Sequence, residues 1–220
     1  MGVRVVEAED PAAAAAAFLS GHLRDLAASR RRVSLAVSGG DTPWPMLRTL
    51  AKLDVPWQQL DVFQVDERIV PHEHQARNFR QLQESLEGLP VQLHAMPVDD
   101  PDVDRAALDY EMSLPDALDV SQLGLGDDGH TASLVRGDPV VDIADRGVAV
   151  TEDYRGYRRM TLTYPAINHS GVIVWLVRGA RKRDALAALL AGDLSIPAGR
   201  IDRDKSVVFA DREALGGVQL

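Results

Sequence analysis

Residues 171–177 read Gly-Val-Ile-Val-Trp-Leu-Val, a run that is apolar at nearly every position. A strand with one face in water alternates apolar and polar residues, whereas a strand covered on both faces does not. Strands of this kind occur mainly in parallel sheets that lie between two layers of helices. The sequence therefore predicts an α/β fold with three layers, in which a largely parallel sheet carries helices on both faces.

The rest of the chain alternates strand-like and helix-like segments, as such a fold requires. Asp10 and Pro11 predict the start of an Ala-rich helix, and Asn78 predicts the N-cap of a later one. No internal repeat or low-complexity linker divides the chain, so we expect a single domain over residues 1–220. The expected strands are 33–37, 60–65, 91–96, 117–125, 148–151, 160–163, 172–177 and 207–210, and the expected helices are 11–29, 43–53, 79–86, 103–112, 131–135 and 181–190.

Composition limits the function. The chain has no Cys, 24 Lys and Arg, and 33 Asp and Glu, for a formal net charge of −9. The absence of Cys fits a cytoplasmic protein, which we expect. We expect no nucleic-acid or membrane partner, because this charge opposes nucleic-acid binding and no apolar run approaches the ~20 residues that cross a bilayer. An anionic ligand needs a local basic pocket, and the arginines within residues 68–80 and 155–183 can supply one.

The run Leu-Gly-Leu-Gly-Asp-Asp-Gly-His-Thr-Ala-Ser-Leu, residues 123–134, carries the strongest chemical signal. It follows a predicted strand and leads into the helix-compatible residues 131–135, so His130 lies at a strand–turn–helix corner. An imidazole, with a reference pKa near ~6.5, can take a proton from water at neutral pH. We expect His130 to be a general base and Asp128 to orient it. The alternative is a glycine turn with a capping Asp and a solvated His.

Two further loops follow predicted strands, and carboxyl ends of parallel strands meet at one edge of a sheet. Gly39 and Gly40 open a turn whose N–H groups can face a phosphate or an oxyanion, although an ordinary strand–helix turn has the same composition. Arg68 follows two carboxylates at the end of another strand, where it suits a phosphate better than a surface ion pair. We do not expect a metal site at His72 and His74, because no third His lies nearby.

The last loop follows the most apolar strand. Arg181, Lys182 and Arg183 begin a helix there, against the sign of the helix dipole. Such a start suggests an anion nearby, and Lys182 is the residue that we expect to bind it. The other cations of this loop are expected to extend into solvent.

Taken in order, these motifs resemble the 6-phosphogluconolactonase family, within the larger family that includes glucosamine-6-phosphate deaminase. The matching pieces are Ser-Gly-Gly-x-Thr-Pro at 38–43, Asp-Glu-Arg-x-Val-Pro at 66–71 with Asn78, the Gly-His run at 124–134, Arg-Met-Thr-Leu-Thr at 159–163, and Gly-x-x-Lys at 179–182. The resemblance implies hydrolysis of 6-phosphoglucono-δ-lactone, a Rossmann-like three-layer fold, and no metal or other cofactor. It also implies that His130 is the base and that Arg68 and Lys182 hold the phosphate.

We therefore expect one site for a small phosphorylated lactone, in a protein that is a monomer or a weak dimer. Its activated water would need donors for the tetrahedral oxyanion and a grip on the remote phosphate, but no redox group. The expected catalytic residues are His130 and Asp128, and the expected substrate-binding residues are Gly39, Gly40, Thr42, Asp66, Arg68, Asn78, Gly129 and Lys182.

The chain departs from the family pattern at two places. Arg77 stands where a Ser commonly precedes the Asn, and Val135 and Arg136 stand where Phe-Pro is common. These changes are expected to alter the rim of the pocket, by adding phosphate contacts or changing specificity. The alternatives are a deaminase, which typically carries Tyr in place of Arg68, and a non-catalytic sugar-phosphate module of a regulator.

Overall fold

The computed structural model describes residues 2–217, and its core is a seven-stranded parallel sheet. The strand order is β1-β10-β9-β6-β2-β3-β5. The predicted three-layer α/β fold is therefore confirmed. The strands are β1 (Arg4–Glu7), β2 (Val33–Val37), β3 (Leu60–Gln64), β5 (Gln92–His94), β6 (Val120–Gly124), β9 (Val172–Val177) and β10 (Ser206–Ala210).

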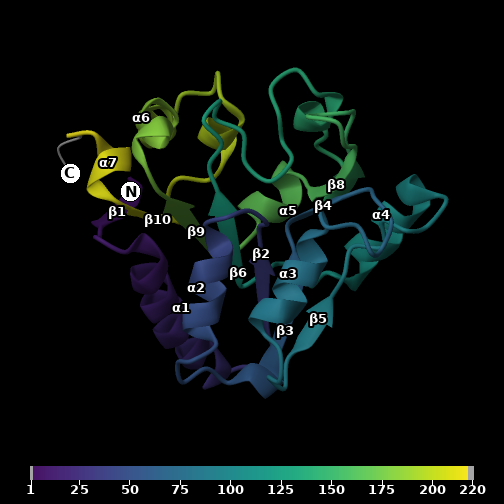
Figure 1. Ribbon diagram of the computed structural model, residues 1–220, viewed down its shortest axis with the longest axis horizontal. Coiled ribbons are helices and arrows are strands. Elements are labelled where there is room, and N and C mark those ends of the chain that lie inside the picture. The colour runs from purple at the N-terminus through teal and green to yellow at the C-terminus, as the bar shows by residue number, and fades with distance from the viewer. Residues whose placement is uncertain (1, 218–220) are drawn as a thin grey trace.

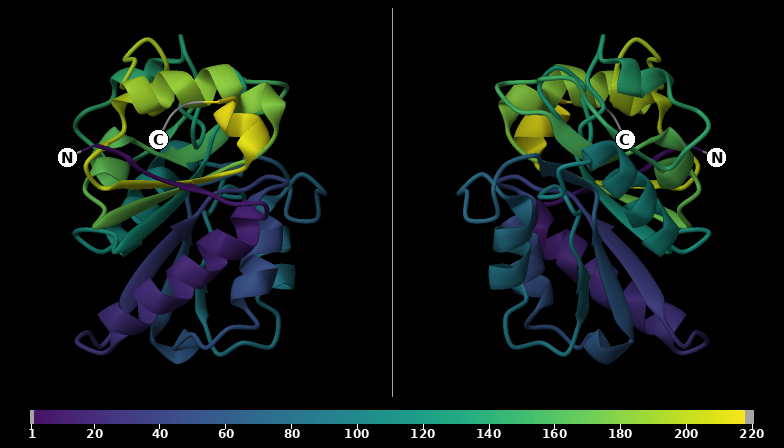
Figure 2. Two further views of the ribbon diagram at one scale, coloured as in Figure 1. Left: turned by 90° about the vertical axis from the view of Figure 1, so that its left-hand side faces the viewer. Right: turned by 90° about the vertical axis from the view of Figure 1, so that its right-hand side faces the viewer.

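Helices cover both faces of this sheet (Figures 1 and 2). On one face, α1 (Pro11–Ala27), α2 (Pro43–Leu50) and α3 (Asn78–Ser85) enclose a core that includes Leu19, Leu47 and Leu82. On the other face, a second core includes Leu186 and Tyr110. It is built with α4 (Val103–Ser113), α5 (Tyr164–Asn168), α6 (Arg183–Ala191) and α7 (Arg212–Leu215). The 3₁₀ turns are η1 (Trp57–Gln59), η2 (Pro139–Asp142), η3 (Ala180–Lys182) and η4 (Pro197–Arg200).

The apolar strand at residues 172–177 is β9, and it lies inside the sheet between β10 and β6. Its Ile173 and Trp175 belong to one core, whereas Val174 and Leu176 belong to the other. Because alternate side chains point to opposite faces, a strand in this position must be apolar throughout. Burial on both faces of the sheet thus accounts for the continuous apolar run from which this strand was predicted.

A small antiparallel sheet was not predicted. It consists of β4 (Asp66–Arg68), β8 (Arg159–Leu162) and β7 (Val148–Val150), in the order β4-β8-β7. The segments 148–151 and 160–163 were correctly expected to be strands, but residues 66–68 were expected to be a loop. β4 is only three residues long and is polar, so the strand pattern gives no signal for it.

The helix expected over residues 131–135 is absent, and that prediction was wrong. Thr131 and Leu134 instead pair across a tight turn, in which Ala132 has a φ of +51°. The side chain of Thr131 donates to the carbonyl oxygen of Gly124, 2.9 Å away, which returns the loop to the end of β6. A five-residue run is too short for its side-chain pattern to distinguish a helical turn from this one.

The structure also corrects the start of α3. Asn78 was expected to be its N-cap, but Arg77 occupies that position and caps nothing with its side chain. The carboxylate of Glu67, on β4, accepts hydrogen bonds from the N–H groups of Asn78 and Phe79, both at 2.8 Å. The helix is therefore capped from another element, which leaves the Asn78 side chain free to serve the loops around it.

Local signals predicted α1 and the end of α6 correctly. The Asp10 carboxylate accepts from the N–H groups of Ala12 and Ala13, at 3.0 and 3.1 Å, and Pro11 is the first helical residue. Gly192 closes α6 in the left-handed conformation, with a φ of +71°. Among the helices within residues 2–217, none has the length and apolar character that crossing a membrane requires.

Replacing the N-cap of α1 tests how far this helix depends on it. Asp10→Ala removes the acceptor for two N–H groups and should lower the free energy of unfolding by about 0.5–2 kcal/mol. For a domain of this size that corresponds to a fall in Tm of roughly 2–4 °C per kcal/mol, measured by circular dichroism. Asp10→Asn retains an oxygen acceptor and serves as the control. Equal Tm values for Asp10→Ala and the wild type would show that the cap contributes nothing.

Candidate active site

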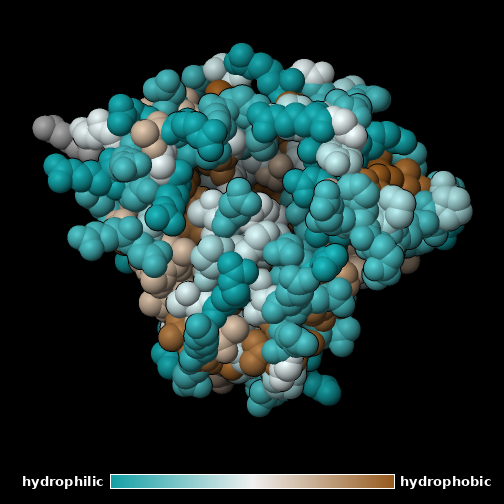
Figure 3. Space-filling model, viewed as in Figure 1, coloured by the Kyte–Doolittle hydropathy of each residue, from teal (hydrophilic) through white to brown (hydrophobic). Residues whose placement is uncertain are grey.

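The predicted chemical loops converge on one cavity. β2 and β6 are neighbours at the centre of the sheet, and the chain leaves them toward opposite edges, which makes this the point where ligands bind in open α/β sheets. A cavity of about 690 Å³ lies at their carboxyl ends and also receives residues that follow β3 and β9. Figure 3 shows this face of the molecule hollowed near its centre, with mostly hydrophilic residues around the opening.

His130 lines the cavity, and Asp128 supports its ring. The imidazole Nδ1 lies 2.5 Å from Asp128 Oδ1, and the same oxygen accepts from the His130 N–H at 3.2 Å. Burial alone would raise the pKa of Asp128, but the hydrogen bond and charge of His130 outweigh it and lower that pKa to about 2. The carboxylate therefore stays ionised at neutral pH and acts as an acceptor for Nδ1–H, which leaves Nε2 to accept a proton.

Gly126 makes room for this pair, and it was not among the predicted site residues. A Cβ atom at position 126 would lie 2.1 Å from His130 Nδ1 and 2.6 Å from Asp128 Oδ1. The N–H of Gly126 also donates to the carbonyl oxygen of His130 at 2.8 Å. Position 126 must therefore be a glycine, because the side chains of His130 and Asp128 occupy the space that a Cβ atom would need.

Gly129 was predicted to bind substrate, but it is not among the residues that line the cavity. It adopts a φ of +81°, and a Cβ atom there would lie 2.6 Å from Cβ of Ile196. Its carbonyl oxygen accepts from the N–H of Ala198 at 3.0 Å. The tight turn and the close packing against residues 196–198 therefore explain why this position is a glycine.

The glycine loop after β2 forms another wall, and Gly39, Gly40 and Thr42 all line the cavity as expected. Within residues 2–217, the N–H groups of Gly39 and Gly40 donate to no protein acceptor, so both are available to a ligand. A Cβ atom on Gly39 would lie 2.2 Å from Cγ of Asn78, which brings the two loops into contact. Thr42 precedes α2 and makes no capping bond with its side chain.

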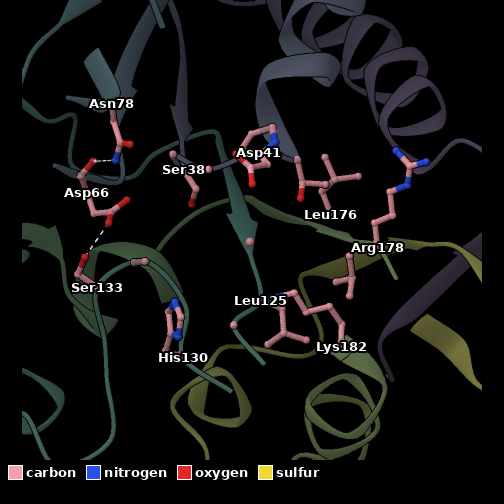
Figure 4. Close-up of a pocket in the computed structure, with 18 of the residues that line it drawn as sticks. Ser38, Asp41, Asp66, Asn78, Leu125, His130, Ser133, Leu176, Arg178 and Lys182 are labelled. Carbon is pink, nitrogen blue, oxygen red and sulfur yellow. Dashed lines mark hydrogen bonds between the residues drawn. The ribbon is translucent and has the colours of Figure 1, made fainter. Parts of the chain in front are cut away.

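Asp66, Arg68 and Asn78 meet at the next wall, also as expected. Arg68 Nη1 donates to the carbonyl oxygen of Ala76 at 2.7 Å and to Asn78 Oδ1 at 3.2 Å. Asn78 Nδ2 donates to the backbone oxygen of Asp66 at 3.1 Å. Ser133 Oγ donates to Asp66 Oδ2 at 2.6 Å, which ties this wall to the His130 loop (Figure 4).

Arg77, the departure from the family pattern, does not line the cavity and is almost fully buried. Its Nη1 donates to the carbonyl oxygen of Val70 at 3.1 Å and to Asp99 Oδ1 at 2.9 Å, and its Nε lies 3.5 Å from Glu67 Oε2. Of the two effects considered for this change, an added phosphate contact does not fit the structure, because the guanidinium is turned toward the protein. Of the second departure, Val135 lines the cavity, and Arg136 Nε donates to the carbonyl oxygen of Ser195 at 2.9 Å.

Lys182 lines the same cavity as Arg68 and His130. Its ammonium group pairs with the carboxylate of Asp127, and this hydrogen bond is the main cause of a lowered pKa for Asp127. An anion was expected near this cationic turn, and the carboxylate of Asp127 is one such anion. In Figure 4, Lys182 lies on the other side of the cavity from Asp66 and Asn78, and Arg178 lies farther out on the same side as Lys182.

Tyr154, Arg155 and Arg159 are among the cavity residues that the predicted site did not include. Tyr154 Oη donates to Asp128 Oδ2 at 2.9 Å. The guanidinium carbons of Arg155 and Arg159 lie 5.0 and 5.1 Å from the centre of the Tyr154 ring. Burial lowers the pKa of Arg159, which is only 8% exposed. The basic stretch 155–183 pointed to these arginines, but no pattern in the sequence pointed to the tyrosine.

The residues that were weighed as metal ligands have other contacts. His72 Nδ1 lies 3.8 Å from Asp99 Oδ2, and His74 Nδ1 accepts from the N–H of Ala76 at 3.1 Å. Across residues 2–217, no three His, Cys, Asp or Glu side chains are grouped so that they could hold an ion. The polar groups that line the cavity include cations, hydroxyls, one imidazole and the separate carboxylates of Asp10, Asp41 and Asp66.

Known proteins resemble this chain over most of its length. A 6-phosphogluconolactonase from Synechocystis sp. is 36% identical over 178 residues, which cover 74% of each chain. A 6-phosphogluconolactonase from Mycobacterium tuberculosis is 34% identical in an alignment 226 positions long that covers 92% of each chain. The crystal structure of 6-phosphogluconolactonase from Thermotoga maritima superposes with a TM-score of 0.85 at 27% identity, covering 96% of this chain and 98% of that one.

A family of proteins described as glucosamine-6-phosphate isomerases and 6-phosphogluconolactonases matches residues 6–209. This span contains every loop that lines the cavity, from the Asp10 turn after β1 to the Lys182 turn after β9. The family match, the identity to the relatives and the shared fold agree, and the chain belongs to this glucosamine-6-phosphate isomerase/6-phosphogluconolactonase family.

Proposed function

We propose that this protein is an enzyme that hydrolyses 6-phospho-D-glucono-1,5-lactone to 6-phospho-D-gluconate, a reaction of the pentose phosphate pathway. The observation that carries the proposal is the His130–Asp128 pair, which faces a cavity whose other walls are rich in cations. The relatives named 6-phosphogluconolactonase support it, because the match extends over 92% of both chains in the mycobacterial case. Arg68, in place of the Tyr that is typical of deaminases, favours the lactonase within the family.

In this mechanism His130 is the general base. Asp128 holds the proton on Nδ1, so Nε2 takes a proton from a water molecule as that water attacks the lactone carbonyl carbon. The carbonyl oxygen becomes an oxyanion, for which the free N–H groups of Gly39 and Gly40 are suitable donors. When the intermediate collapses, the bond to the ring oxygen breaks, and that oxygen takes the proton from the imidazolium. The products are the open-chain acid and the neutral histidine.

Arg68 and Lys182 hold the phosphate in this proposal. Of the three guanidinium nitrogens of Arg68, only Nη1 donates a hydrogen bond to a residue within 2–217. The other two remain available to a ligand. To bind the phosphate, the Lys182 ammonium would either break its ion pair with Asp127 or contact Asp127 and the phosphate at the same time. Binding the remote phosphate fixes the lactone ring against His130, and such positioning lowers the barrier by several kcal/mol.

Removing the base gives the first test. His130→Ala should reduce kcat by about 10²–10⁴-fold, the usual effect of losing a general base, while the protein remains folded. The assay follows acid release from the lactone and subtracts the fast spontaneous hydrolysis. His169→Ala is the matched control, because His169 is exposed and lies outside the cavity. A His130→Ala enzyme with wild-type turnover would contradict the assignment of the base.

The dependence of the rate on pH gives the second test. The pKa of Asp128 is lowered to about 2, so its carboxylate stays ionised between about pH 4 and 8. A fall in kcat/KM within this range should therefore follow a single group, the imidazole that has to be neutral. Asp128→Asn removes the negative charge that favours the protonated ring, so the acidic limb should move to lower pH and kcat should fall. An unchanged limb would show that Asp128 does not act on His130.

The third test concerns the phosphate. Arg68→Ala and Lys182→Ala should each raise KM strongly and also lower kcat, because the phosphate grip positions the ring. Hydrolysis of unphosphorylated glucono-lactone should be slow in the wild type and nearly unchanged in both variants. Equal losses on the two lactones would mean that these cations act on something other than the phosphate. Glucosamine 6-phosphate serves as the control substrate, and its deamination would favour the sibling activity.

Three expectations from the sequence remain predictions. We propose a cytoplasmic location, a monomer or weak dimer, and a single domain over the whole chain. Fractionation of cells, sedimentation velocity and a single calorimetric transition are the corresponding measurements. A stable higher oligomer would contradict the second of these predictions.

A further inference from the structure

Tyr154 completes a row of three side chains that ends at the proposed base. Its Oη donates to Asp128 Oδ2 at 2.9 Å, and Asp128 Oδ1 lies 2.5 Å from His130 Nδ1. The phenol ring also meets the imidazole edge to face, with ring centroids 5.6 Å apart and an interplanar angle of 66°. The tyrosine thus contacts both members of the pair, at the carboxylate and at the ring.

We propose that Tyr154 is a positioning residue for the lactone hydrolysis inferred above: it holds Asp128 in the orientation that directs His130 Nε2 into the cavity. The inference rests on that proposed function, since it concerns the same site. Tyr154 acts through Asp128 and takes no proton from water or lactone itself.

The carboxylate needs such support because it lies on a loop and its side chain is 45% exposed. An exposed carboxylate can rotate about its Cβ–Cγ bond and accept from water with either oxygen. Here one oxygen accepts from His130 and the other from Tyr154, so rotation would break both hydrogen bonds. Charge-assisted bonds of this kind are the strong ones, and two of them define the carboxylate plane.

The protonation states fit these roles. Burial and the hydrogen bond to Asp128 raise the pKa of Tyr154, so the phenol remains a donor at neutral pH. Burial would raise the pKa of Asp128, but the contacts with His130, supported by the Tyr154 hydroxyl, lower it to about 2. The Tyr154 hydroxyl therefore remains the donor and the Asp128 carboxylate the acceptor at neutral pH.

Tyr154 reaches Asp128 from a separate and well-braced element. It lies in the turn that joins β7 to β8, where its N–H donates to the carbonyl oxygen of Tyr157 at 3.0 Å. Arg155 adopts a φ of +56°, a conformation rare outside glycine, and Asp153 Oδ1 accepts from the N–H of Gly156 at 2.9 Å. Arg155 and Arg159 stack over the phenol ring at 5.0 and 5.1 Å and fix its plane.

The sign of the effect on pH follows from the charges. The Tyr154 hydroxyl donates a hydrogen bond to Asp128 and so stabilises its negative charge. When this hydroxyl is removed, Asp128 becomes a stronger anion beside the imidazole. A stronger anion favours the protonated ring, so the acidic limb of kcat/KM should move to higher pH. The other charged groups nearby are Arg155 and Arg159 over the phenol and the Asp127–Lys182 pair, and all four are retained when only the hydroxyl is removed.

The test compares Tyr154→Phe with Tyr157→Phe in the full chain. Tyr157 is the bridge partner of Tyr154 in the same turn, and its hydroxyl has no hydrogen-bond partner among residues 2–217. Tyr154→Phe should lower kcat roughly 10- to 150-fold, in the range for one hydrogen bond to a charged group, with KM changed by less than about twofold. Its acidic limb should move to higher pH, opposite to that of Asp128→Asn, whereas Tyr157→Phe should keep the wild-type limb.

A second measurement needs no substrate. Nitrogen-15 NMR of the histidine rings, with His130→Ala to assign the signal, reports the tautomer and its titration. We expect the neutral ring of the wild type to carry its proton on Nδ1 and the midpoint to rise in Tyr154→Phe. In an Asp128→Asn background, Tyr154→Phe should have little further effect on either the limb or the midpoint, because the two residues act in series.

The outcomes separate the two proposals. A wild type without lactonase activity would overturn the proposed function, whereas an active wild type with an unchanged limb and midpoint in Tyr154→Phe would overturn the positioning role alone. A loss of kcat that is accompanied by the same loss of Tm and no change in pH dependence would mark Tyr154 as a residue that only stabilises the turn, and would also overturn it.

Discussion

The geometry of the site depends on one buried carboxylate, Glu67, which has no exposed surface. Its Oε1 accepts from the N–H groups of Arg68 and Asn78, and its Oε2 accepts from Phe79 N–H and Gln64 Nε2, all at 2.8 to 2.9 Å. Burying a charge is costly unless it is paired and fully hydrogen-bonded, and four donors with Arg77 nearby meet that condition. Because these donors come from β3, β4 and α3, the one carboxylate fixes the wall that carries Arg68 and Asn78.

The sheet topology decides which loops can share a substrate. The strands that carry the Gly39 loop and the His130 loop are adjacent only because β6 returns to the far side of β2 after the chain has built β3 and β5. A parallel sheet places the carboxyl ends of its strands at one edge, so the pairing of β2 with β6 brings the proposed base and the proposed backbone donors to the same cavity. Within the set of loops that the topology brings together, Glu67 then fixes the positions of Arg68 and Asn78.

Motifs at the ends of apolar strands predicted most of this site, because the strand pattern and the glycines are local properties. The same reasoning placed His130, Gly39 and Arg68 in one cavity. It failed where a contact is made across the fold. Glu67 caps a helix eleven positions away, Gly129 packs against Ile196, and Tyr154 reaches Asp128 from another sheet. None of these partners lies within a turn of the other, so no periodicity in the sequence reports them.

Charge completes the argument. A chain with a net charge of −9 repels a phosphate dianion at long range, and screening limits that repulsion to about 8–10 Å at physiological salt. Capture must therefore come from cations at the cavity, yet Lys182 is already paired with Asp127, whose lowered pKa keeps it ionised. A phosphate bound by Lys182 has to compete with this carboxylate. If Lys182 and Arg68 hold the phosphate as proposed, this competition reduces the contribution of Lys182 and favours release of the phosphorylated product. Arg68 then contributes more, because its guanidinium donates only to the neutral oxygens of Ala76 and Asn78 among residues 2–217.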